Sequence, residues 1–304
     1  MDHLVGIDVG CTNVKALALS GAGKLRAEVS VPTRDDGSGA WVSQVLHAFR
    51  KVARKPDGRE PIVGVAAPGL AAKDQKSIAC MPGRLLGIEG LVWRELFHLV
   101  QPVPVLNDAH AALMGECWAG AAKGARNVIL LTLGTGVGGA AMVDGQLLRG
   151  AIGRAGHLGH ISLNPDGPKD VANTPGSLED AIGDCTVSTR TNGRFESTAR
   201  LVQAALRGDQ EAKRICLVSV KNLAAGIAGL INVLDPEIVV LGGGIAKAGP
   251  VLLRPLRKHL ESFEWRPGGH RARIVLAELG DRAGAYGAAW NAIQPRRAGR
   301  SRLE

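Results

Sequence analysis

The sequence predicts an α/β protein made of two similar domains that face one cleft. Each half of the chain opens with an apolar strand, a glycine-rich turn that carries a threonine, and a second strand. The two openings lie at residues 6–13 and 131–139. A repeat at this large spacing is typical of a duplicated pair of α/β domains. The chain has 304 residues, which is long enough for two domains and a cleft between them.

The first half of the chain predicts a meander of three strands, then a helix and two buried strands. Strands are expected at residues 4–9, 14–19, 25–31, 62–67 and 103–106. A helix is expected at residues 40–54, where apolar residues recur at helical spacing. A second helix at residues 109–121 follows the last strand, which ends at Asn107 and Asp108.

The second half repeats this pattern with longer helices. Strands are expected at residues 127–133, 140–143, 146–149, 238–241 and 274–277. Helices are expected at residues 196–207, 210–233 and 283–293. The dipeptide Asp144-Gly145 predicts a tight hairpin.

The composition limits the classes of function. Only 3% of the residues are aromatic, so the core must be built mainly from Ala, Val, Leu and Ile. The net charge of +9 invites a nucleic-acid interpretation. However, much of the excess lies in the segment 254–273 and in the tail, at Arg296, Arg297, Arg300 and Arg302. Since no basic run is interleaved with aromatic residues, solvated surface is favoured over nucleic-acid binding.

The cysteines and the N-terminus predict a reduced, cytoplasmic protein. The five cysteines are scattered and form no Cys-x-x-Cys pair, which argues against a disulfide framework or a clustered metal site. The first residues show no signal-peptide pattern. No uncharged apolar run approaches the length of a membrane span, so no membrane partner is expected.

The two glycine turns predict a phosphate site. Glycines let backbone N–H groups converge on a phosphate, because no Cβ blocks the approach and positive φ angles are accessible. Thr12 and Thr135 can add hydroxyl donors, and Asp8 can orient a Mg²⁺ ion, usually through water. A single glycine-rich hairpin is more often only a hairpin. Two of them, with Asp8 beside the first, favour phosphate binding.

The usual phosphate signatures are absent. The sequence contains neither a P-loop nor the motif set of protein kinases. The glycines at positions 134, 136 and 138 lead into another strand rather than a helix, so a dinucleotide-binding fold is not indicated.

Asp108 is the candidate general base. It stands where a strand ends and a helix begins, so its carboxylate can be exposed at the edge of a cleft. Phosphoryl transfer needs mainly positioning and charge stabilisation, with one carboxylate to accept the hydroxyl proton. The alternative is that Asp108 only caps the helix, since Asn and Asp are favoured caps.

Five ordered segments of the chain resemble the motifs of the ROK group (repressors, open reading frames, kinases). The resemblance runs from about residue 4 to about residue 290. It rests on the segments 6–13 (first phosphate motif), 64–69 (connecting strand and sugar-side loop), 105–116 (Asn-Asp sugar segment), 131–139 (second phosphate motif) and 239–245 (adenosine motif).

The resemblance implies a glucokinase-like enzyme that moves the γ-phosphate of ATP to a sugar hydroxyl. It implies two actin-like ATPase (ribonuclease H-like) domains around a central cleft, commonly in a homodimer. The first domain would comprise residues 1–108, completed by the C-terminal helix at 283–304. Residues 109–282 would form the second domain, which binds nucleotide and mediates dimerisation.

The resemblance also assigns residues, with Asp108 as general base. The expected sugar-binding residues are Gly69, Asn107, Asp108, His157, His160 and Glu179. The expected ATP and phosphate residues are Asp8, Gly10, Thr12, Asn13, Lys15, Gly134, Thr135, Gly136, Gly138, Gly242, Gly243 and Gly244. The expected cofactors are ATP and Mg²⁺, with Asp8 toward the metal. For Glu179 the alternative is an acid in the first turn of a helix after Ser177.

The sequence departs from the family at its zinc site. His160 matches the family's zinc histidine, but none of the three family cysteines is present in the segment 170–179. A structural zinc needs four ligands, typically thiolates and imidazoles. Since His160 and Asp170 cannot supply them, no structural zinc is expected.

Other departures concern the sugar. His157 stands where the family has a glutamate, and Gly83 or Arg84 stands where it commonly has an asparagine. A neutral imidazole has one acceptor and one donor, whereas a carboxylate accepts two protons. Glucose is therefore the default substrate, while mannose, fructose, allose and N-acylated hexosamines such as N-acylmannosamine stay open, as does polyphosphate as donor.

Two other functions compete with a kinase. A sugar-responsive repressor of this family would carry a helix-turn-helix segment, for which the three residues before the first strand leave no room. A silent sugar-binding protein would have no use for Asp8, Thr12, Asp108 and the second phosphate turn together. A kinase is the expectation that the residues favour.

Overall fold

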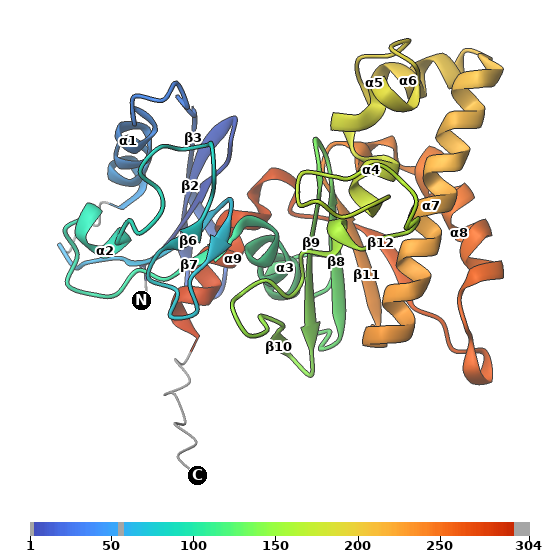
Figure 1. The fold of residues 1–304 in the computed structure, drawn as a ribbon. Helices are drawn as coiled ribbons and strands as arrows, with labels where there is room; N and C mark the ends of the chain where they lie inside the picture. Colours follow the sequence, from blue (N-terminus) through green and yellow to red (C-terminus); the bar gives the residue numbers. More distant parts are fainter. Residues whose placement is uncertain (1–2, 54–57, 295–304) are drawn as a thin grey trace. The chain divides into compact units, whose positions relative to one another are not determined.

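The computed structural model describes residues 3–53 and 58–294, which form two compact units (Figure 1). Unit 1 contains the described residues up to Trp118 together with those from Arg282 onward, and unit 2 is the continuous segment Ala119–Asp281. The expected boundary at residue 108 differs from this division by the helix that follows it. Positions 295–304 of the expected C-terminal helix, with their four arginines, lie outside the described residues.

Unit 1 contains a five-stranded sheet in the order β3-β2-β1-β4-β7. Its strands are β1 (His3–Val9), β2 (Asn13–Ser20), β3 (Leu25–Pro32), β4 (Ile62–Ala67) and β7 (Val105–Asn107), beside a small pair, β5 (Leu70–Ala71) and β6 (Ile78–Cys80). Its helices are α1 (Trp41–Ala53), α2 (Trp93–Leu96), α3 (Asp108–Ala119) and α9 (Ala283–Ile293), and the turn η5 (Gly280–Arg282) before α9 spans the boundary with unit 2. The meander β1–β3 is antiparallel, and β4 and β7 are added in parallel.

The two faces of this sheet carry different helices, because side chains alternate along each strand. Val5 and Ile7 of β1 lie in one core cluster with Trp41 and Val45 of α1. The opposite face is open at Gly6, where α9 packs.

A pair of glycines lets α9 approach the sheet backbone. Gly6 of β1 and Gly64 of β4 lie side by side in register. A Cβ built at Gly6 would lie 1.8 Å from the carbonyl oxygen of Ala285, and one at Gly64 would lie 1.9 Å from that of Ala288. We call Gly6 and Gly64 the glycine notch. It is the reason that a helix so late in the sequence belongs to unit 1.

The helix α3 belongs to unit 1 for the same physical reason. A Cβ at Gly115 would lie 2.3 Å from the carbonyl oxygen of Ala283, and one at Gly287 would lie 1.7 Å from that of Ala111. The backbones of α3 and α9 therefore touch at these glycines, which ties α3 to unit 1.

Unit 2 repeats the strand order of unit 1, as β10-β9-β8-β11-β12. Its strands are β8 (Val128–Leu133), β9 (Val137–Val143), β10 (Gln146–Leu147), β11 (Ile238–Gly242) and β12 (Arg273–Leu276). Its α-helices are α4 (Leu178–Ile182), α5 (Val187–Arg190), α6 (Thr198–Leu206), α7 (Gln210–Leu234) and α8 (Pro250–Phe263). Its 3₁₀ turns are η1 (Leu158–His160), η2 (Asp184–Thr186), η3 (Ile245–Ala248) and η4 (Pro267–Gly269). The strand directions match those of unit 1 as well, so the predicted duplication is confirmed.

The helix α7 is the central helix of unit 2. Leu223, Ile227 and Ile231 on its buried face share a core cluster with Leu131 of β8 and Leu256 of α8. In the part of the chain that the structure describes, α7 is the one helix whose length and composition would also permit a membrane span, although a core helix passes the same test. The sequence analysis found no such segment.

Candidate active site

The first glycine turn joins β1 to β2 and is braced from outside. The Gly10 N–H donates to the Asn13 carbonyl at 3.0 Å, which closes the turn. The Thr33 hydroxyl donates to the Gly10 carbonyl at 2.6 Å, and the Thr33 N–H donates to the Thr12 carbonyl at 2.8 Å. A Cβ at Gly10 would lie 2.9 Å from the Asn13 oxygen. Glycine is therefore needed here for tight closure rather than for a positive φ. The Thr12 side chain is exposed, and that of Asn13 is half-buried.

Asp8 lies at the end of β1, beside the start of α9. It pairs across the hairpin with Lys15 of β2. A Cβ at Gly284 would lie 2.5 Å from its carboxylate, so a glycine in the first turn of α9 makes room for this acid. Asp8 is half-exposed. One carboxylate with room for water fits the way Mg²⁺ is usually held in proteins.

Asn107 and Asp108 take different roles at the start of α3. The buried Asn107 accepts hydrogen bonds from the N–H groups of Ala109 and His110 at 3.0 and 3.3 Å, so it caps the helix. Its amide donates to the carbonyl of Gly69 at 3.0 Å and ties that loop down. Asp108 is exposed, with Oδ1 accepting from the Ala109 N–H at 2.8 Å. Capping by Asn107 leaves the Asp108 carboxylate at the surface.

Charged groups of unit 1 gather around Cys11 in the first glycine turn. Burial raises the pKa of the Cys11 thiol, the Arg84 guanidinium lowers it, and the carboxylates of Asp108, Asp35 and Asp8 raise it further. Such effects require proximity, because solvent and salt screen distant charges. The acid at the end of β7 and the acid at the end of β1 therefore lie near the same turn.

A hollow of about 570 Å³ lies beside these groups, along residues 81–89. Asp35 lines it and holds the segment in place, since Oδ1 accepts from the Leu85 N–H at 2.8 Å and Oδ2 lies 3.5 Å from Arg84 Nε. Gly83 also lines this hollow and has a φ of +77°. Arg84 is thus more than an isolated surface charge.

The second glycine turn, between β8 and β9, is braced by residues that follow α4. The Gly134 N–H donates to the Gly136 carbonyl at 2.9 Å. The Asp184 N–H donates to the Gly134 carbonyl at 2.9 Å, and the Cys185 N–H donates to the Thr135 carbonyl at 2.8 Å. A Cβ at Gly134 would meet no atom within 4 Å. Packing within the described residues therefore does not explain this glycine, whereas close approach of a ligand would.

Glu179 holds the second glycine turn by a hydrogen bond to its backbone. It is 8% exposed, and Oε2 accepts from the N–H of Val137 at 2.8 Å. A Cβ at Gly136 would lie 2.3 Å from that oxygen, so glycine is needed beside this carboxylate. The acid is in the first turn of α4, where Ser177 caps the helix. The alternative interpretation, an acid in the first turn of a helix after Ser177, is therefore confirmed, and the sugar-binding role of Glu179 stays a prediction.

The third glycine segment packs against the second turn. Gly243 has a φ of +85°, and a Cβ there would lie 2.3 Å from the carbonyl oxygen of Leu133. Gly242 ends β11, and Gly244 faces open space. An apolar cavity of about 50 Å³ lies behind this segment, between η3 and α6. The buried Oγ1 of Thr198, which lines this cavity, has no hydrogen-bond partner among the described residues.

The two predicted histidines lie on a short turn beside β9. His157 Nδ1 is 2.9 Å from the Arg154 carbonyl. His160 Nδ1 is 2.7 Å from Oδ2 of Asp170, whose side chain is fully buried. Ligand atoms of His160, Asp170 and Glu179 all lie within 4.8 Å of one another.

These three groups do not fit a structural zinc well. The Asp170 carboxylate already accepts from two backbone N–H groups and faces His160, and one oxygen of Glu179 accepts from Val137. The four ligands of a structural zinc are not assembled within the described residues. The absence of zinc stays a prediction.

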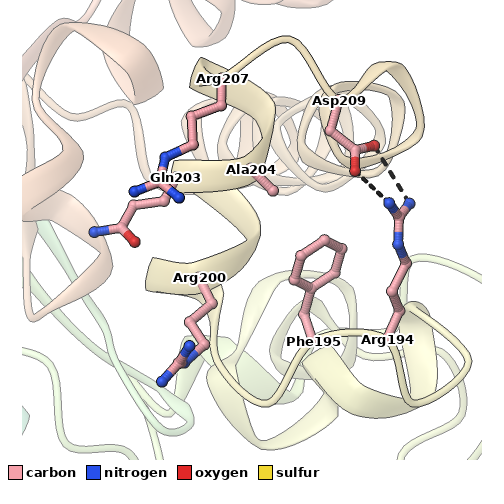
Figure 2. A pocket seen from close by; sticks show the side chains of 7 residues that line it. All are labelled: Arg194, Phe195, Arg200, Gln203, Ala204, Arg207 and Asp209. Carbon is pink, nitrogen blue, oxygen red and sulfur yellow. Dashed lines mark hydrogen bonds and ion pairs between the residues drawn. The ribbon is translucent and has the colours of Figure 1, made fainter.

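A separate hollow of about 420 Å³ lies between α6 and the loop that joins α5 to α6 (Figure 2). Arg194 and Asp209 form an ion pair at its rim, and the Arg194 guanidinium also lies 5.2 Å from the centre of the Phe195 ring. Arg200 and Arg207 line it as well. This surface accounts for part of the positive charge.

The structure therefore divides the predicted residues into two groups, one in each unit. Those in unit 1 are Asp8, Gly10, Thr12, Asn13, Lys15, Gly69, Asn107 and Asp108. Those in unit 2 are Gly134, Thr135, Gly136, Gly138, His157, His160, Glu179, Gly242, Gly243 and Gly244. Sequence reasoning missed Thr33, Asp184 and Thr198, which brace the turns or line the cavity, and it gave Asp170 no role.

Comparisons with known proteins agree over the whole fold. The model of the ROK family matches residues 4–294. A glucokinase of Halalkalibacterium halodurans is 32% identical over 317 residues, which cover 94% of this chain and 93% of the relative. The ROK hexokinase from Thermus thermophilus is 30% identical, with a TM-score of 0.79 and coverage of 94% and 96%. A ROK family glucokinase from Streptomyces griseus, solved with glucose and AMPPNP, is 28% identical, with a TM-score of 0.78 and coverage of 96% and 100%. The expected actin-like ATPase fold of two α/β domains is thereby confirmed.

Proposed function

This chain belongs to the ROK family and is an ATP-dependent sugar kinase, and we propose that it transfers the γ-phosphate of ATP to a hexose hydroxyl with Asp108 as general base. The observation that carries the proposal is that Asp8 and Asp108 stand at the carboxyl ends of β1 and β7, at the same edge of the unit 1 sheet. It supports a carboxylate and a magnesium ligand acting at one phosphate turn.

The role of Asp108 is supported by what Asn107 does. Asn107 caps α3, and the neighbouring Asp108 is exposed, with one carboxylate oxygen accepting from the Ala109 N–H. An exposed carboxylate at the end of a parallel strand can accept the proton of a sugar hydroxyl as the oxygen attacks phosphorus. Asn107 is then a positioning residue, which fixes both Asp108 and the Gly69 loop.

The nucleotide is assigned to unit 2. Gly134 and Gly244 both face open space, so the triphosphate can approach the backbone there without a clash. The apolar cavity of about 50 Å³ between η3 and α6 is too small to hold an adenine ring, so the base is expected outside it, next to Gly244. Asp8 would hold Mg²⁺, which neutralises charge on the phosphates when bound.

Glucose is the proposed acceptor, because the relative and the solved neighbour that carry the name glucokinase cover nearly the whole chain. His157 in place of the family glutamate leaves mannose, fructose, allose and N-acylmannosamine as alternatives. Cytoplasmic location and a homodimer belong to the same proposal.

The assignment of the base is tested by Asp108→Asn. The amide keeps the size of the side chain but cannot accept the proton, so kcat should fall by about 10²–10⁴-fold while glucose and ATP still bind. Coupled detection of ADP release measures the rate, and calorimetry measures binding.

The matched control is Asp144→Asn, at an exposed aspartate in the β9–β10 hairpin whose φ of +51° suits asparagine. This variant loses the same charge and should keep full activity. If Asp108→Asn turns over as fast as this control, Asp108 is not the base.

A further inference from the structure

The loop before α4 is organised around one buried carboxylate, that of Asp170. Oδ1 accepts from the N–H groups of Ala172 and Thr174 at 2.8 and 2.9 Å. Oδ2 lies 2.7 Å from Nδ1 of His160, and the Asp170 side chain is fully buried. The acid therefore folds its own turn with one oxygen and holds the imidazole with the other.

The carboxylate is ionised at neutral pH. Burial opposes ionisation, but hydrogen bonds from the side chain of His160, the N–H of Thr174, the hydroxyl of Ser177 and the N–H of Ala172 lower the pKa of Asp170 below its ordinary value. An ionised carboxylate can only accept hydrogen bonds. Nδ1 of His160 must therefore carry the proton that lies between them.

This hydrogen bond determines what the other ring nitrogen can do. In a neutral imidazole one nitrogen donates and the other accepts, so a proton on Nδ1 leaves Nε2 as an acceptor. Within the described residues, no hydrogen bond to Nε2 is made, and the His160 side chain is 29% exposed. The bare nitrogen is therefore available to a ligand.

The position of His160 is fixed against the second glycine turn. A Cβ at Gly159 would lie 1.8 Å from the Val137 carbonyl oxygen, so the turn η1 packs directly on β9. Glu179, which holds the Val137 N–H, has a carboxylate oxygen within 4.8 Å of the ligand atoms of His160 and Asp170. The imidazole thus lies beside the turn assigned to the triphosphate.

We propose that Asp170 is a positioning residue for sugar binding, which holds His160 in the tautomer whose Nε2 accepts a hydrogen bond from a sugar hydroxyl. The proposal rests on the sugar kinase function. Glu179 lies beside His160, with a carboxylate oxygen within 4.8 Å of a ring nitrogen of the imidazole, so the two residues can contact neighbouring hydroxyl groups of one pyranose.

The test is Asp170→Asn, which reverses the direction of the hydrogen bond to His160 and keeps the hydrogen bonds from the backbone N–H groups. The amide oxygen can still accept from Ala172 and Thr174, while the NH₂ group now faces His160 and must donate to Nδ1. The proton of the ring then moves to Nε2, which becomes a donor. Asp166→Asn is the matched control, because Asp166 is exposed in the same loop and loses the same charge.

Two readouts follow, and neither requires turnover. The ¹⁵N chemical shifts of the imidazole should show a protonated Nδ1 and a bare Nε2 in the wild type and in Asp166→Asn, and the reverse in Asp170→Asn. Calorimetry without nucleotide should show glucose affinity falling about tenfold in Asp170→Asn, the effect of one lost hydrogen bond. In a His160→Phe background, Asp170→Asn should cause no further loss, because the two residues act through one interaction.

The wild-type spectrum alone can overturn the proposal, which protects the test from a variant that fails to fold. A bare Nδ1 in the wild type would contradict it. So would an equal loss of affinity in Asp166→Asn, or a further loss in the His160→Phe background. Failure of the kinase proposal gives a different result, namely no ADP release with any hexose from a protein that shows the expected tautomer and binds glucose.

Discussion

The glycine notch on β1 and β4 can be tested by one methyl group, in the variant Gly6→Ala. A Cβ at position 6 would lie 1.8 Å from the carbonyl oxygen of Ala285 in α9. An ordinary contact of this kind is 3.4 Å or longer, so 1.8 Å falls about 1.6 Å short of it. Because the obstructing atom belongs to the main chain, it cannot rotate away, and α9 itself must move.

The cost should lie at the upper end of the range for overpacked cores. Inserted methyl groups typically destabilise by about 1–3 kcal/mol. We expect about 3 kcal/mol for Gly6→Ala, since the contact is with backbone on both sides. A shift of α9 would also disturb Asp8, because Gly284 of that helix lies against its carboxylate.

Urea unfolding measures the free-energy change, and near-ultraviolet circular dichroism measures the shift of the helix. Trp290 of α9 stacks on Trp118 of α3 with ring centres 4.9 Å apart, so the signal of this pair reports the place of α9. Gly134→Ala is the control, since a Cβ there meets nothing within 4 Å. If Gly6→Ala unfolds at the same urea concentration as that control with an unchanged dichroism spectrum, the packing argument is refuted.

Two further outcomes are expected. Gly134→Ala should raise the KM for ATP at least about tenfold without changing stability, because only a ligand approaches this position closely; steady-state kinetics with an unchanged KM would contradict the phosphate assignment. Metal analysis should find no stoichiometric zinc, and treatment with EDTA should leave the melting temperature unchanged, because Asp170 already binds His160 directly; a tightly held zinc ion would show that this loop is wrongly interpreted.

The strands of both sheets could be predicted because their signals are local. Apolar runs closed by glycine or by Asn-Asp marked β1, β4, β7, β8 and β11 to within two residues of their bounds at each end. The likeness of the two halves was also visible in the sequence, and the identical strand orders confirm it.

The helix α8 was not predicted, because its segment was interpreted from its basic charges and not from the spacing of its apolar residues. Segment 254–273 was interpreted as basic surface, and no helix was expected there. Yet Leu252, Leu256 and Leu260 recur every four residues, and all three are buried. The amphipathic pattern was present, and the proline near the N-terminal end did not prevent the helix.

The glycines of the phosphate motifs proved to have several physical roles. Sequence alone assigned them to phosphate binding, whereas Gly6 and Gly243 accommodate neighbouring backbone and Gly136 accommodates Glu179. Only contact distances between residues far apart in sequence separate these from Gly134 and Gly244, which face open space.

The contacts that support the site residues could not be predicted from the sequence, because they also join residues that lie far apart along the chain. Asn107 was expected to touch sugar, and the cap was considered only for Asp108, while nothing local showed the bond from Asn107 to the Gly69 loop. The hydrogen bond between Glu179 and Val137 joins residues 42 positions apart, and the bond between His160 and Asp170 depends on the fold of the loop between them.

The late arrival of α9 in the sequence sets an order of events on the ribosome. The sheet of unit 1 is synthesised first, but the helix that fills its glycine notch follows the whole of Ala119–Asp281. At about 5–20 residues per second, the interval is roughly 8–33 seconds. During vectorial synthesis the inserted unit can fold to completion, while the earlier one waits with one face of its sheet uncovered.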